Sequence, residues 1–171
     1  DVSLLRNTQF REDAGPTAHP IQPDHYQAID NFYTTTIYEK GSEVIRALHT
    51  LLGEEVFMQG MALYVSRHDG TAATCNDFVQ AMEDAAEAAW ARGARLPRFD
   101  FGQFRTWYRQ AGTPQLQLER HWDGERGTLS LTLRQTTRPT PGQPQKAPVV
   151  IPLVLGLVGQ AGEPLPVRLQ G

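Results

Sequence analysis

The spacing of apolar residues changes once along this 171-residue chain, near Gly112. Before that point, apolar residues recur every three or four positions, which is the period of a helix with one buried face. After it they alternate with polar residues, as at Leu116 and Leu118, which is the period of a strand. Helices followed by strands are typical of the α+β class. We therefore expect a helical lobe over 1–111 and part of an antiparallel β-sandwich over 112–171.

Start and stop signals divide the first half into four expected helices. These helices are predicted over about 32–52, 54–67, 74–92 and 100–108. Gly53 separates the first two, because glycine readily ends a helix. Thr74 and Asp77 form a variant of the capping box at the start of the third. Residues 1–30 follow no regular period and contain several prolines, so they need neighbouring segments to order them.

The second half is predicted to begin with a hairpin that turns at Asp123-Gly124, a pair that favours tight turns. Residues 136–148 are rich in Thr, Pro, Gly and Gln, and we expect a mobile loop there. A nearly continuous apolar strand is expected over 149–158, and 162–170 is expected to add another. So few strands rarely cover both faces of a sheet, and self-association through the uncovered strands is expected.

Charge, hydropathy and cysteine content exclude several classes of protein. A net charge of −3 and a pI near 5.9 argue against nucleic-acid binding, which needs a basic surface. No apolar run approaches the roughly 20 residues that span a bilayer, so no membrane contact is expected. The single Cys75 cannot form an internal disulfide, and we expect a cytoplasmic protein. The chain begins at Asp1 without an initiating methionine, and we expect it to be a piece of a longer protein.

Two tyrosines, Tyr33 and Tyr38, lie at the start of the first expected helix, in the segment from Asn31 to Gly41. A tyrosine hydroxyl can donate a hydrogen bond to an oxygen that becomes negative when a carbonyl is attacked. From spacing alone, however, a tyrosine on a helix most often serves packing. On that interpretation the chain is a non-catalytic helical-plus-β interaction module.

An ordered set of motifs resembles the aminopeptidase N family, the bacterial-type zinc metalloaminopeptidases of the gluzincin group. The stretches that carry this resemblance are 8–16, 18–21, 31–46, 51–55, 67–75, 78–84 and 107–114. The first two are similar to the segment before the family's tyrosine helix, and the third to that helix with its Tyr-x-Lys-Gly motif. The last is similar to the crossing into the family's β-sandwich domain. Tyr-x-Lys-Gly alone is a weak motif, whereas the ordered set is specific. Beyond residue 114 only the strand pattern is similar.

This resemblance implies the helical lobe of a thermolysin-like catalytic domain followed by the start of a β-sandwich. It implies removal of N-terminal amino acids from peptides, with Tyr38 as the catalytic residue that stabilises the tetrahedral intermediate. It implies that Tyr33 lines the substrate pocket, and an aromatic core role for Tyr33 is an equal alternative. The family uses zinc, held partly by a His-Glu-x-x-His helix. None of the five histidines here precedes Glu, so we expect the ligands upstream of Asp1 and expect this chain alone to be inactive and to bind no zinc.

The other candidates for chemistry are weaker. His19 and His25 could ligate a metal together with Asp24, but a hydrogen-bonded loop role is the stronger interpretation. Cys75 lies beside a helix N-terminus and could have a lowered pKa, yet no base neighbours it in the sequence. The side chains of adjacent carboxylates such as Glu12-Asp13 point apart, and each is expected to cap a helix or face solvent.

Overall fold

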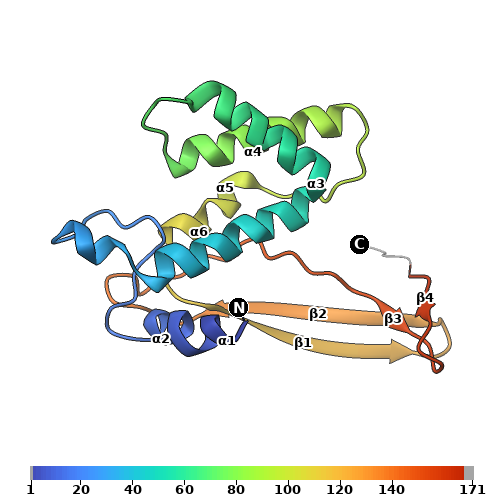
Figure 1. Cartoon of the computed structure of the whole chain (residues 1–171). Helices are drawn as coiled ribbons and strands as arrows, with labels where there is room; N and C mark the ends of the chain where they lie inside the picture. Colours follow the sequence, from blue (N-terminus) through green and yellow to red (C-terminus); the bar gives the residue numbers. More distant parts are fainter. Residues whose placement is uncertain (1, 168–171) are drawn as a thin grey trace.

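Helices come first and two small antiparallel sheets follow in the computed structural model, which describes residues 2–167 (Figure 1). The α+β class expected from the periodicity is thus confirmed. None of the helices in this described part is long and apolar enough to cross a membrane.

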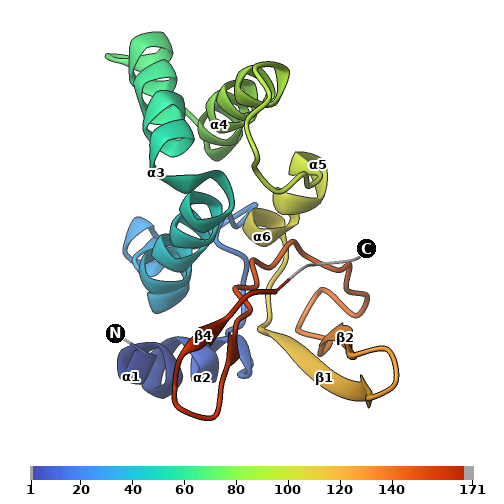
Figure 2. The same cartoon turned by 90° about the vertical axis from the view of Figure 1, so that its right-hand side faces the viewer.

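The first helical segment is a continuous run of α1 (Val2–Leu4), π-helix η1 (Leu5–Gln9) and α2 (Phe10–Asp13). It lies beneath the start of α3 in both views (Figures 1 and 2). A short 3₁₀-helix η2 (Ile29–Phe32) comes next. The following π-helix η3 (Thr36–Lys40) leads without a break into α3 (Gly41–His68).

The sequence pattern predicted that the first long helix begins near Phe32. In the structure it begins at Thr36. Tyr33 interrupts the helical path, with φ −86° and ψ 66° after η2. Gly53 has φ 70° and ψ 164°, a conformation that side chains with a Cβ rarely adopt. The two helices expected on either side of Gly53 thus follow one another across a kink at this residue, and Figure 2 shows α3 changing direction along its length.

Helix α4 (Cys75–Ala91) packs against α3, and its predicted capping box is confirmed. The Thr74 hydroxyl accepts from the backbone N–H of Asp77 at 3.2 Å, and the Asp77 carboxylate accepts from the backbone N–H of Thr74 at 2.8 Å. The fourth expected helix is divided into α5 (Phe101–Phe104) and α6 (Thr106–Arg109), with Asp100 as the cap of α5.

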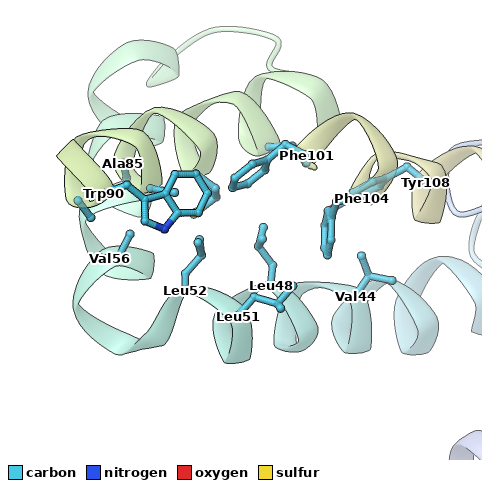
Figure 3. Close-up of a cluster of buried hydrophobic side chains, with 14 of the residues drawn as sticks. Val44, Leu48, Leu51, Leu52, Val56, Ala85, Trp90, Phe101, Phe104 and Tyr108 are labelled. Atoms are coloured by element: carbon cyan, nitrogen blue, oxygen red, sulfur yellow. The ribbon is translucent and has the colours of Figure 1, made fainter. Parts of the chain in front are cut away.

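The hydrophobic core lies between α3, α4, α5 and α6 (Figure 3). Val44, Leu48 and Leu52 project from one face of α3. Leu48 points towards Phe101 and Val44 lies beside Phe104, whose rings are both buried. Leu52 lies opposite the indole of Trp90. Burying side chains of this size contributes about 1.5–3 kcal/mol each, which holds the start of α3 firmly in place.

The predicted hairpin is confirmed. Strand β1 (Pro114–Asp123) pairs antiparallel with β2 (Thr128–Thr137), with Asp123 opposite Thr128. The Asp123 carboxylate accepts from the backbone N–H groups of Glu125 at 3.0 Å and Arg126 at 3.1 Å, which closes the turn.

The prediction of a strand over 149–158 is wrong. Its last two residues alone are paired, as β3 (Leu157–Val158) against β4 (Pro164–Leu165). Residues 168–170 of the final expected strand lie outside the described residues. An apolar run forms a strand only with a hydrogen-bonding neighbour, and no described strand pairs with residues 150–156. The start of the run contacts the helices, where the indole N–H of Trp107 donates to the carbonyl of Val150 at 2.7 Å.

The loop over 136–148 has anchors that its composition did not indicate. The amide of Gln135 exchanges two hydrogen bonds with the backbone of Val149, at 2.8 and 2.7 Å. The ammonium of Lys146 donates to the carbonyl of Ala111 at 2.9 Å and to the side chain of Gln143 at 3.0 Å. These contacts attach the loop to the helical part and to Val149, and the composition of the loop does not predict them.

We predict that the chain self-associates through the apolar segment 153–158. Val154 is 88% exposed and Val158 is 70% exposed, and water-exposed apolar groups of this kind favour association. Sedimentation should show dimers or larger species, and Val154→Lys should shift the distribution towards monomer. A compact monomer for the unaltered chain would contradict this prediction.

Candidate functional site around Tyr33 and Tyr38

Tyr33 and Tyr38 form an exposed aromatic pair at the entrance to α3. Their rings stack with centroids 6.3 Å apart and planes at 24°. Tyr33 is 61% exposed and Tyr38 is 59% exposed, so neither belongs to the core of the described residues. Phe32 meets Tyr33 edge-on at 6.3 Å, and Tyr26 meets Phe32 at 5.9 Å. The result is a row of aromatic rings in which the three tyrosines are exposed and Phe32 is partly buried.

Tyr38 lies in the middle of η3, whose π-helical turn is wider than an α-turn. Such turns are rare and frequently occur at functional sites. The backbone N–H of Tyr38 donates to the carbonyl of Thr34 at 3.2 Å. The direction of the Tyr38 ring therefore depends on the backbone of the turn that carries it.

The carboxylate of Glu12, from α2, holds the beginning of this turn. One of its oxygens accepts from the hydroxyl and backbone N–H of Thr36, at 2.6 and 2.8 Å, and from the hydroxyl of Thr35 at 2.8 Å. The amide of Gln9 donates to the Thr36 hydroxyl from the other side, at 3.4 Å. Glu12 thus satisfies a free N–H at the start of η3 from another helix, where the local cap residue Thr35 makes no capping bond.

The end of the same turn is held by a buried ion pair. The ammonium of Lys40 lies 2.8 Å from the carboxylate of Asp13, and their side chains are 6% and 1% exposed. Lys40 also donates to the carbonyl of Gly112 at 3.0 Å. Asp13 accepts from the backbone N–H of Gly112 and the hydroxyl of Thr113, each at 3.0 Å. These bonds join α2, η3 and the segment that leads into β1.

Both carboxylates are stabilised in their charged form. Burial by itself would raise the pKa of Asp13, but the positive charge and hydrogen bond of Lys40 together bring the pKa below its usual 3.8. Burial would likewise raise the pKa of Glu12, and the hydrogen bonds from Thr36 and Thr35 bring it below its usual 4.5. The two groups therefore bind protons less readily in the folded chain than in the unfolded chain.

We predict that acid unfolds the chain through these groups. A carboxylate with a lowered pKa contributes stability above its unfolded pKa and loses it as the pH falls through its folded pKa. The unfolding midpoint should be steady from about pH 7 to about pH 5 and fall steeply below about pH 4. Glu12→Gln should reduce that fall, because one proton-linked group is gone. Thermal melts of both chains across this range would contradict the prediction if their pH dependences coincide.

The contacts of His19 and the burial of Cys75 indicate structural roles for these two residues. His19 contacts the carbonyl of Thr17 and the hydroxyl of Thr34, each at 2.8 Å, which confirms its hydrogen-bonded loop role. Within residues 2–167, no three His, Cys, Asp or Glu side chains gather as metal ligands would. Cys75 does not have the lowered pKa that its place beside a helix N-terminus could have produced, since burial raises the pKa of its thiol.

Sequence reasoning missed the anchoring role of Glu12 and Lys40. One signal was present: Lys40 lies four residues before Val44 and eight before Leu48, on the buried face of the helix. A lysine at such a position needs an anionic partner. Which carboxylate supplies it depends on a contact across 27 residues, and spacing does not predict such a contact.

The sequence matches two protein-family descriptions in succession. Residues 3–104 match the Peptidase family M1 domain. Residues 112–170 match a domain of unknown function, DUF3458, described as having an Ig-like fold. The first match covers more than half of the chain, so the chain belongs to peptidase family M1.

Its relatives include proteins named Aminopeptidase N. That of Escherichia coli (strain K12) is 47% identical over all 171 residues, and the match covers 18% of the relative's own length. That of Haemophilus influenzae is 48% identical over 95% of this chain and 17% of the relative. The chain thus spans less than a fifth of these relatives.

The fold is also similar to part of a solved structure. The crystal structure of Legionella pneumophila aminopeptidase A in complex with aspartic acid matches 80% of this chain and 16% of that one, with a TM-score of 0.57. At 21% sequence identity, this likeness concerns the fold alone.

Proposed function

We propose that this chain is a segment of a longer aminopeptidase that removes N-terminal residues from peptides, and that Tyr38 is one of its catalytic residues. The observation that carries the proposal is the placement of Tyr38. Its ring is exposed, while the turn beneath it is held at both ends by carboxylates of α2. A side chain used only for packing would have no need of such exposure on so firmly held a turn.

The proposed role of Tyr38 is to donate a hydrogen bond from its hydroxyl. When the carbonyl of a peptide is attacked, its oxygen gains negative charge, and a donor already in position stabilises that charge. The tyrosine keeps its proton throughout. Because the turn is fixed before substrate arrives, little reorganisation is needed at the moment of reaction.

The proposed role of Tyr33 is substrate binding. Its exposed ring is stacked beside Tyr38, so a peptide that places its carbonyl near the Tyr38 hydroxyl would pass over Tyr33. Aromatic faces of this kind contribute apolar contact area without charge. We also propose that the chain divides into a peptidase part over 1–111 and a sandwich part over 112–171.

A zinc ion is proposed for the longer enzyme, with its ligands outside this chain. The described residues offer no set of three ligands, so they do not fit a zinc site by themselves. No part of the role given to Tyr38 depends on where the metal lies.

We predict that the chain by itself neither retains zinc nor cleaves aminoacyl substrates. Dialysis against dilute zinc, followed by metal analysis, should leave far less than one equivalent bound. Aminoacyl anilides should show no turnover with the chain and measurable turnover with the longer protein. Stoichiometric zinc on the chain, or turnover that a chelator abolishes, would contradict this prediction. Absence of turnover from the longer protein would instead favour a non-catalytic interaction module.

A further inference from the structure

We propose that Glu12 and Asp13 are positioning residues that together hold the turn carrying Tyr38, one at its beginning and one at its end. The inference rests on the catalytic role proposed above for Tyr38. It assigns a specific task to an acidic pair whose members are adjacent in sequence and whose side chains reach opposite ends of one turn.

The geometry of the pair supports this task. Glu12 receives three hydrogen bonds of 2.6 to 2.8 Å from Thr35 and Thr36, which lie three and two residues before Tyr38. Asp13 binds Lys40, two residues after Tyr38, at 2.8 Å. Both carboxylates come from adjacent residues of one short helix, α2. The turn is therefore held on both sides of Tyr38 by the same helical element.

The surroundings separate this arrangement from an ordinary helix cap. A local cap satisfies one N–H of its own helix, whereas Glu12 reaches η3 from 23 and 24 residues away. Asp13 is buried and also accepts hydrogen bonds from Gly112 and Thr113. The same carboxylate therefore links the turn to the segment that enters β1. Shifting a reacting group by about 1 Å can lower a rate about 100-fold, so such restraint has a direct use at Tyr38.

The experiment is a double-mutant cycle in the longer enzyme. Glu12→Gln keeps the shape of the side chain but removes its charge and some of its capacity to accept. We expect kcat to fall about 10- to 100-fold with a small change in KM. In the Tyr38→Phe background the same change should lower kcat less than about 2-fold further, because the hydroxyl that Glu12 positions is already gone.

Two further variants keep the test decisive. Asp77→Asn removes a matched capping carboxylate, which accepts from the hydroxyl and N–H of Thr74 at the N-cap of α4, and should leave kcat unchanged. Thr35→Val deletes one donor to Glu12 with little change of shape and should lower kcat in the same direction, while Thr35→Ser should restore it. Thermal melts confirm that each variant is folded at the assay temperature.

The outcomes distinguish the positioning role of Glu12 from the catalytic role of Tyr38. Loss of kcat in Glu12→Gln and Thr35→Val that disappears in the Tyr38→Phe background supports positioning. An unchanged kcat in Glu12→Gln, or an equal loss in both backgrounds, overturns positioning and leaves the role of Tyr38 standing. A normal kcat in Tyr38→Phe alone overturns the catalytic role of Tyr38, and the positioning role with it.

Discussion

Replacing Tyr38 by phenylalanine in the longer enzyme should lower kcat by about 10²–10³, equivalent to about 3–4 kcal/mol, and leave the fold intact. Phenylalanine keeps the ring and its stacking on Tyr33, so the turn is undisturbed. It deletes a hydroxyl whose partner oxygen carries full negative charge only as the tetrahedral intermediate forms. Interactions made at that stage affect kcat, whereas KM should change little.

Tyr33→Phe is the matched control for that experiment. It removes a hydroxyl from the neighbouring ring, which is equally exposed, and should change kcat only mildly with any effect mainly in KM. Steady-state kinetics on both variants decide the matter. A near-normal kcat in Tyr38→Phe, or equal losses in the two variants, would contradict the catalytic role of Tyr38.

Lys40→Met should destabilise the chain by about 3–5 kcal/mol. The substitution leaves the Asp13 carboxylate, 1% exposed, without its cation, and an unpaired buried charge is costly. It also removes the donor to the carbonyl of Gly112. Because this energy is a large part of the stability of a typical domain, the variant should unfold at far lower urea concentration.

The control for Lys40 is another ion pair in the helical part. Arg67 and Asp84 are paired with side chains 42% and 38% exposed, so water already solvates both charges. Arg67→Met should cost at most about 1 kcal/mol. In urea unfolding, the loss of unfolding free energy should therefore be several times larger for Lys40→Met than for Arg67→Met. A cost for Lys40→Met as small as that for Arg67→Met would mean that the buried pair contributes little.

Local rules predicted those elements whose signals lie within a few residues. Thr74 and Asp77 satisfy each other across one turn, so the start of α4 was readable from the sequence. Gly53 separates two helical stretches because glycine, which has no Cβ, readily adopts a positive φ. The hairpin at Asp123 combines an alternating pattern with a turn signal, and both act locally.

Elements that depend on distant partners could not be predicted in this way. The run 149–158 is apolar enough for a strand, but strand pairing needs a neighbour that composition does not supply. The bonds of Glu12 to Thr35 and Thr36 cross more than twenty residues, and the bond of Asp13 to Gly112 crosses 99. The resemblance pointed to Tyr33 and Tyr38, whose roles stay predictions, and spacing did not indicate the carboxylates that bind the turn around Tyr38.

The most direct test of the account compares two inhibitors of the longer enzyme on the Tyr38→Phe variant. One is a peptide analogue with a tetrahedral phosphinate in place of the scissile carbonyl, and the other is a planar, uncleaved peptide. We predict that the variant binds the tetrahedral analogue about 10²–10³ weaker and the planar peptide with nearly unchanged affinity. Equal affinity of both enzymes for the tetrahedral analogue would contradict the claim that Tyr38 serves the transition state.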